Sequence, residues 1–240
     1  MEYQNGILNM YSSRQHVYMY KQKGEKQMAE YTTDNNWVQI AGTVDSDLTF
    51  SHEMYGEGFY NFFIAVPRLS DYIDRLPVTV SERLIGDIDL SLGTKVYIGG
   101  QLRSYNKLID GANRLVLTIF VREITNNVEG IKNPNQIYLN GFVCKTPVYR
   151  ITPFKREIAD LLIAVNRSYN KSDYIPNIAW GRNARYCQNI SVGDNIKIWG
   201  RIQSRQYQKK LPSGEIEERT AYEVSISKME VVKADQNKEK

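Results

Sequence analysis

The chain of 240 residues is poor in the side chains that metal sites, disulfide frameworks and many active sites require. It has only two cysteines, Cys144 and Cys187, and two histidines, His16 and His52. The cysteines lack CxxC spacing and histidine partners, so we expect two buried free thiols rather than a zinc site or a disulfide. Neither histidine lies near a catalytic arrangement of side chains, and we expect no metal and no cofactor.

Sequence motifs of common enzymes are also missing. There is no Gly-rich phosphate loop, no HExxH and no nucleophile elbow, which argues against an enzyme. No apolar run approaches the roughly 20 residues that span a bilayer, and the N-terminus lacks the apolar segment of a secretory signal. The sequence therefore predicts a cytoplasmic protein without membrane contact.

A long hairpin is predicted between Gly193 and Val224. Ile196 and Ile198 alternate with Lys197 and Trp199, so one face of this segment is apolar and the other carries cations and an indole. The pattern continues to a Lys-Lys-Leu-Pro-Ser-Gly turn and resumes beyond it. Cations interleaved with flat rings suit a charged backbone that carries flat bases, and single-stranded nucleic acid is the commonest such ligand.

An internal repeat fixes the predicted architecture. Three pairs of segments match at a steady offset of 99 to 100 positions: residues 36–42 with 135–141, 63–68 with 162–167, and 93–102 with 193–202. Each repeat reads as five strands with one short helix before the fourth, and we place the helices at residues 81–92 and 183–191, closed by Gly93 and Gly193. This pattern predicts an all-β chain, with one short helix per domain, that forms two tandem OB-fold five-stranded Greek-key barrels.

The predicted domain boundaries follow from this repeat. We expect OB-fold domains at residues 34–126 and 135–233, with a Gly-, Pro- and Asn-rich linker at 127–134 and a disordered tail at 234–240. Residues 1–33 are expected to be either a disordered arm or translated leader. The leader hypothesis rests on Lys23-Gly24-Glu25, which AAAGGAGAA can encode as a ribosome-binding string upstream of a start at Met28.

The second repeat resembles the bacterial single-stranded-DNA-binding protein family. It opens with an Asn-x-Ile-x-Leu-x-Gly pattern at 135–141 and continues with ADLLIAVNR at 159–167. It then leads from Val-Gly-Asp at 192–194 to IWGRI at 198–202. The first repeat carries a similar VYIGGQLR at 96–103. The resemblance implies coating of single-stranded DNA in replication, recombination or repair. A replication-restart accessory like primosomal protein N and a tandem OB-fold scaffold for protein interaction remain as alternatives.

The family's stacking rings can be carried over by position. In the second repeat they fall on four aromatic residues: Tyr169, Tyr174, Trp180 and Tyr207. In the first repeat the corresponding positions are approximately Ser70, Tyr72, Val78 and Lys107, so only the ring of Tyr72 remains. Each ring taken alone fits an ordinary surface or core aromatic at least as well. The four together favour the binding interpretation.

Charge is distributed unequally between the repeats. Residues 34–134 hold nine Lys and Arg against thirteen Asp and Glu, a net charge of −4, and residues 135–233 hold sixteen against nine, a net charge of +7. A polyanion should therefore prefer the second repeat. The cations predicted to line its path are Arg167, Arg182, Arg185, Arg201, Arg205 and Lys209, with Arg103 from the first repeat.

The resemblance also suggests how the chain assembles. Family members with one barrel per chain usually act as tetramers, so two barrels per chain predict a two-fold homodimer in which the acidic first repeat forms the partner surface. A monomer whose first barrel is a solubilising or regulatory module is the alternative. The sequence ends in KADQNKEK without the family's acidic tip, so recruitment of other replication proteins is less expected than DNA coating.

Overall fold

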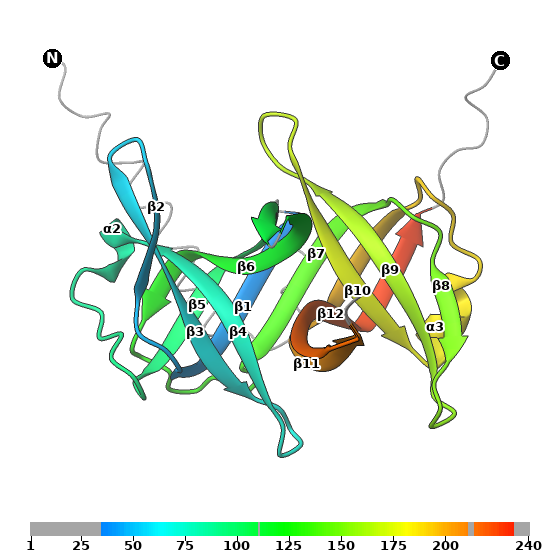
Figure 1. Cartoon of the computed structure of the whole chain (residues 1–240), viewed down its shortest axis with the longest axis horizontal. Helices are drawn as coiled ribbons and strands as arrows, with labels where there is room; N and C mark the ends of the chain where they lie inside the picture. The colour runs from blue at the N-terminus through cyan, green and yellow to red at the C-terminus, as the bar shows by residue number, and fades with distance from the viewer. Residues whose placement is uncertain (1–34, 110, 211–213, 233–240) are drawn as a thin grey trace, which may run out of the picture. The chain divides into compact units, whose positions relative to one another are not determined.

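The computed structural model describes residues 35–109, 111–210 and 214–232. The predictions made for the arm or leader at residues 1–33 and for the tail at 234–240 lie outside the described residues. Within them, the chain consists mostly of β-strands, with two short helices (Figure 1).

Each repeat contributes six strands and one short helix. The first repeat comprises β1 (Asn36–Val44), β2 (Thr49–Met54), β3 (Glu57–Pro67), β4 (Ile73–Ser81), α2 (Glu82–Ile85), β5 (Lys95–Ile109) and β6 (Ala112–Thr125). The second comprises β7 (Asn135–Val143), β8 (Val148–Ile151), β9 (Glu157–Asn166), β10 (Ser172–Trp180), α3 (Arg182–Cys187), β11 (Asn195–Lys210) and β12 (Ile216–Val232).

Two matching sets of strand pairs close the two barrels. β1 pairs with both β5 and β3, and β7 pairs in the same way with both β11 and β9. A parallel contact completes each barrel, between β4 and β6 in the first repeat and between β10 and β12 in the second. The predicted all-β architecture of two tandem OB-fold barrels is confirmed.

Alternation of apolar and polar residues explains why these segments form strands. In β11, Ile196 and Ile198 are fully buried, whereas Lys197 and Trp199 keep part of their surface in water. The antiparallel pairing of β11 with β12 runs from Asn195 opposite Val232 to Lys210 opposite Ile216, which confirms the predicted long hairpin. Apolar side chains of both repeats form one continuous cluster of buried residues.

The predicted loop between the first two strands of each repeat contains a further strand. β2 and β8 are short edge strands that pair with β3 and β9, respectively. Every residue of β2 is exposed, so this strand has no buried face to produce an alternating pattern. The expected five strands per repeat are therefore six.

The helices are shorter than predicted, and Gly93 and Gly193 do not cap them. α2 ends at Ile85, where Gly86 with a φ of 39° stops it. Beyond this point the Asp89 carboxylate accepts hydrogen bonds from the Ser91 amide (2.9 Å) and the Thr94 hydroxyl (3.1 Å), which stabilises a turn in competition with the helix. α3 ends at Cys187, and Gly193 lies in the turn before β11 with a φ of 92°.

The repeats join through antiparallel pairing of β1 with β7 (Figure 1). Val38 lies opposite Ile137, its own counterpart in the repeat, and the pair of Asn36 with Leu139 mirrors that of Ile40 with Asn135. The junction therefore has an internal two-fold symmetry of the kind that relates two copies in a homodimer. Side chains of Asn36 and Asn135 continue the symmetry, because they bond the backbones of Leu102 and Ile202, respectively.

The glycine that ends the repeated opening motif has a steric role. A Cβ atom on Gly141 would lie 2.5 Å from the Ala164 carbonyl oxygen, and one on Gly42 would lie 2.4 Å from that of Ala65. These contacts are shorter than van der Waals packing allows. Only glycine lets β1 and β7 approach β3 and β9 at the point where each barrel closes.

Candidate nucleic-acid interface

A groove of about 720 Å³ lies on the face formed by β10, β11 and β12 of the second repeat, and the first repeat contributes to it. The residues that line it are mostly arginines and neutral polar side chains with two rings: Arg68, Tyr72, Arg156, Ile178, Trp180, Arg201, Gln203, Ser204, Arg205, Gln206, Glu223 and Ser225. Four predicted binding residues meet there: Tyr72, Trp180, Arg201 and Arg205.

Trp180 occupies the last position of β10. Alternation along this strand buries Ile175 and turns Tyr174 and Trp180 outward, and 37% of the Trp180 surface is exposed. The indole Nε1–H donates a hydrogen bond to the Ser225 hydroxyl on β12 at 3.1 Å. This bond satisfies the ring's only polar group and fixes its orientation, so the rest of the indole is an apolar platform at the groove.

The arginines of the groove produce an excess of positive charge. Arg201 and Arg205 project from the same face of β11, and Arg156 comes from the turn between β8 and β9. Burial is the main cause of a lowered pKa of Arg201, and repulsion from Arg68 lowers the pKa further. A guanidinium remains charged in either case, so the crowding favours binding of an anion between these side chains.

One carboxylate stands among these cations. Glu223 is buried on β12, where Oε1 accepts a hydrogen bond from Gln203 Nε2 at 2.7 Å and lies 3.7 Å from Arg205 Nε. This ion pair links the Arg205 side chain of β11 to β12. The groove thus carries four arginines against one glutamate.

The first-repeat side of the groove is built on a buried ion pair. Arg68 donates to both carboxylate oxygens of Asp74, at 2.7 and 2.6 Å, and the Asp74 side chain is almost fully buried. This bonding raises the pKa of Arg68. The guanidinium carbon lies 4.4 Å from the centre of the Tyr72 ring, an arrangement typical of a cation–π contact.

The remaining predicted rings and cations lie outside the groove lining. Tyr174 and Tyr207 are exposed on β10 and β11, and Tyr169 is 94% exposed in the turn between β9 and β10 with a φ of 61°. Lys209 is exposed on β11, Arg182 is exposed at the start of α3, and Arg185 pairs with Glu157 at 3.0 Å.

Two predicted binding arginines meet at the junction instead. Arg103 Nη1 donates to Asp173 Oδ2 at 3.1 Å, and Arg167 Nε lies 3.3 Å from the same oxygen. Asp173 is fully buried and also accepts a hydrogen bond from the Ser104 amide at 2.6 Å. This cluster is the counterpart of Arg68 and Asp74, on the other side of the two-fold axis.

Comparison with known proteins agrees with this geometry. The model of a protein family described as "Single-strand binding protein family" matches residues 134–232. Single-stranded DNA-binding protein B of Bacillus subtilis (strain 168) is 33% identical over 86 residues, which cover 32% of this chain and 74% of that protein. The chain belongs to the single-strand binding protein family.

Other members of the family match over a smaller share of their length. The single-stranded DNA-binding protein of Clostridium tetani is 35% identical over 83 residues, 32% of this chain and 57% of that protein. The chain spans about half the length of most curated relatives it matches. The wild-type single-stranded DNA binding protein of Thermus aquaticus shares the fold, with a TM-score of 0.65 and 19% identity over 85% of this chain and 96% of that one.

Sequence reasoning within the family missed Arg68 and Arg156. Arg68 reaches the groove from the other repeat, although its alignment with Arg167 had marked it as a repeated position. Arg156 follows the edge strand β8, in a segment that the sequence analysis did not recognise as structured. Phe154, in the same turn, is exposed beside it.

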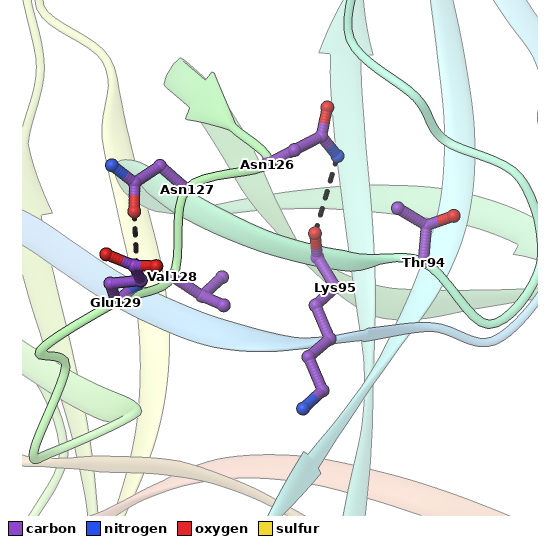
Figure 2. A pocket seen from close by; sticks show the side chains of 6 residues that line it. All are labelled: Thr94, Lys95, Asn126, Asn127, Val128 and Glu129. Atoms are coloured by element: carbon purple, nitrogen blue, oxygen red, sulfur yellow. Dashed lines mark hydrogen bonds between the residues drawn. The ribbon is translucent and has the colours of Figure 1, made fainter.

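A second hollow, of about 550 Å³, lies at the end of β6 (Figure 2). It is lined by Thr94, Lys95, Asn126, Asn127, Val128 and Glu129. Asn126 Nδ2 donates to the backbone oxygens of Asp89 (2.8 Å) and Lys95 (3.3 Å), which ties the connection between the repeats to the first barrel. With one lysine, one glutamate and no ring, this hollow lacks the character of a nucleic-acid site.

Both cysteines lie among the described residues. Cys187 is buried, and burial raises the pKa of its thiol to about 11. Cys144 is only half-buried, contrary to expectation, and its thiol donates to the Leu162 carbonyl at 3.0 Å. Among residues 35–109, 111–210 and 214–232, no helix is long and apolar enough to cross a membrane, and no cluster of metal-binding side chains occurs.

Proposed function

We propose that this chain binds single-stranded DNA without sequence preference, by stacking bases on aromatic rings and neutralising phosphates with arginines. The observation that carries the proposal is the groove in which the fixed indole of Trp180 lies among Arg68, Arg156, Arg201 and Arg205. A platform for bases beside cations for phosphates is the usual construction of single-strand sites. The printed names of its relatives, single-stranded DNA-binding proteins, support the same function.

The exposed rings beyond the groove extend the proposed path. Tyr174 lies on the same face of β10 as Trp180, and Tyr207 follows Arg201 and Arg205 along β11. Tyr169, Lys209 and Arg182 stand at the ends of these elements and remain proposed contacts. We assign Arg103 and Arg167 first to the junction, because the buried carboxylate of Asp173 already engages both.

We also propose that the chain divides into OB-fold domains at residues 34–126 and 135–233, that it is not an enzyme and that it acts in the cytoplasm. A protein that coats single strands needs no catalytic group, and its ligand is found in the bacterial cytoplasm. A replication-restart accessory would use the same groove, whereas a scaffold for protein interaction would leave it without a nucleic-acid ligand.

Titration of labelled oligo-dT, followed by fluorescence anisotropy at increasing salt, tests the proposal. Each neutralised phosphate contributes a slope of about −0.7 in log K against log salt, so the arginines of the groove predict a slope of about −2 to −3. Oligo-dC should bind within a few-fold of oligo-dT. An affinity that does not change with salt, or no binding at all, would contradict the proposal and favour the scaffold.

We further propose a homodimer of two-barrel chains. The junction between β1 and β7 satisfies one pairing of barrels within the chain, and a two-fold dimer would bring together four. Light scattering at micromolar concentration, with and without oligo-dT, measures the mass. A value near 27.8 kDa in both conditions means a monomer.

A further inference from the structure

The groove of the second repeat is completed by the turn between β3 and β4 of the first repeat, which supplies Arg68 and Tyr72. We infer that a single strand bound in this groove crosses from the second barrel onto the first at this turn, and that Tyr72 stacks one of its bases. Tyr72 would then serve the groove of the other repeat rather than the corresponding face of its own. The inference rests on the proposed function.

The turn is held by both barrels. Arg68 Nη2, bound to Asp74, also donates to the Ser204 carbonyl on β11 at 3.1 Å. The Ser204 amide returns a hydrogen bond to Asp74 Oδ1 at 2.7 Å. Because these bonds link β4 to β11, the position of the turn beside the groove is fixed, and a ring carried on it is preorganised for a ligand.

The geometry of the turn directs the Tyr72 ring. The Arg68 amide donates to the Tyr72 carbonyl at 2.9 Å, which closes a tight turn and brings the two side chains together. The guanidinium covers one side of the ring at 4.4 Å, yet 46% of the Tyr72 surface remains exposed. A base can stack on the side of the ring that Arg68 leaves open.

The symmetric turn in the second repeat carries its ring at a different position. The Arg167 amide donates to the Lys171 carbonyl at 2.7 Å, so the backbone bond is the same, but Lys171 stands where the first repeat has Tyr72. The Arg167 guanidinium lies against Asp173. An ammonium group can contact a phosphate but offers no face for a base. The ring of this turn is Tyr169, which is 94% exposed, whereas the Tyr72 ring lies 4.4 Å from the Arg68 guanidinium. The two turns therefore present their rings differently.

Three variants of the full chain test the inference: Tyr72→Ala, Tyr72→Phe and Tyr105→Ala. Tyr105 is a matched control, because it belongs to the same repeat, is 45% exposed and does not line the groove. With an oligo-dT of about ten nucleotides, Tyr72→Ala should weaken binding about tenfold or more, the loss expected for one base–ring stack. Tyr72→Phe keeps the ring and should bind within about twofold of the unmodified chain, as should Tyr105→Ala.

Trp180→Ala, measured alongside, separates failure of the inference from failure of the proposed function. If Tyr72→Ala binds normally while Trp180→Ala is weakened, the inference is overturned and the groove keeps its function. An equal loss in Tyr72→Ala and Tyr105→Ala also overturns it, since the turn would then have no special role. If Trp180→Ala binds normally as well, the proposed use of the groove fails.

A covalent measurement supplies independent evidence that does not depend on affinity. An oligo-dT with one 5-iodouracil, irradiated on the unmodified chain, should crosslink to Tyr72 at one substitution position and to Trp180 at another. Peptide mass spectrometry identifies both sites. Crosslinks on Trp180 at some positions but on Tyr72 at none would contradict the crossing.

Discussion

The groove of the second repeat and the aligned face of the first differ less in charge than in the placement of their rings. The twelve groove positions carry four arginines and one glutamate, a net charge of +3. Their repeat counterparts carry Arg103, Arg167, Lys171 and Glu57, a net charge of +2. The net charges of +7 and −4 for the whole repeats therefore do not describe the two faces. The local arrangement of side chains, and of the rings above all, distinguishes the groove from the aligned face.

An exchange of residues between neighbouring strands moves the ring. In the strand register, Trp180 and Ser225 of the second repeat correspond to Ser81 and Phe120 of the first. The counterpart of Trp180 is therefore Ser81 and not Val78, the position expected from the sequence. Phe120 packs against Phe59 with ring centroids 5.8 Å apart, whereas Trp180 is held at the edge of the groove by its bond to Ser225. A ring that packs against another ring stabilises the barrel, and one that stands free at a groove is available to a ligand.

The largest predicted effect concerns the two junction carboxylates. Asp173→Asn leaves Arg103 and Arg167 without a counter-charge, whereas Asp74→Asn leaves only Arg68. Breaking a buried ion pair costs roughly 3–5 kcal/mol, and the partly exposed arginines place both changes near the lower value, with Asp173→Asn the more destabilising. Urea denaturation measures the free energy of unfolding.

A surface pair provides the control for this comparison. Asp160→Asn breaks the exposed contact with Arg150 and should change stability by less than about 1 kcal/mol. Equal effects of Asp74→Asn and Asp173→Asn would show that the junction is energetically symmetric despite its different partners.

Converting the second groove toward the first gives the next largest effect. Trp180→Ser installs the residue found at Ser81 and removes the stacking platform while preserving every charge. The expected loss is about 1–3 kcal/mol of binding free energy, or about tenfold to more than a hundredfold in the Kd for oligo-dT. Tyr186→Ser removes an exposed ring of the same repeat outside the groove and should leave the Kd unchanged. A variant that unfolds would instead assign Trp180 to the core.

The smallest predicted effect concerns Arg156, the groove position at which the two repeats carry opposite charges. Arg156 aligns with Glu57, so Arg156→Glu gives this position of the second groove the charge that it has in the first repeat. Loss of one phosphate contact should make the salt slope shallower by about 0.7, with a several-fold loss of affinity at low salt. Lys145→Glu makes the same change of charge at an exposed site of the same repeat outside the groove, and its slope should stay near that of the unmodified chain.

The fold was largely predictable because its determinants are local and are repeated. Alternation at Ile196 and Ile198 fixes a strand within a few residues, and the repeated motif order specifies how the strands pair. The helix expected at residues 81–92 failed for an equally local reason. Leu84 and Ile88 have helical spacing, but Gly86 and the Asp89 side-chain bonds favour a turn, from which Leu90 reaches the core.

The candidate site was predictable in part. Trp180 and Tyr72 came from the positions of the family's stacking rings, and Arg201 and Arg205 came from the excess of cations in the second repeat. Arg68 enters from a segment more than 130 residues from Ser204, a contact that no local pattern reports. The same limit applies to Arg103 and Arg167, whose charges suggested a DNA path although a buried aspartate of the junction binds both.

The pairing of β1 with β7 makes the association of the barrels independent of dilution. Residues 126–134 connect the two halves covalently, so each barrel meets its partner at an effective concentration set by a short connection rather than by the amount of protein present. Two barrels on separate chains would dissociate at low concentration, and a groove built from both barrels would then be lost. Here, even a single copy of the chain keeps Arg68 and Tyr72 beside Trp180.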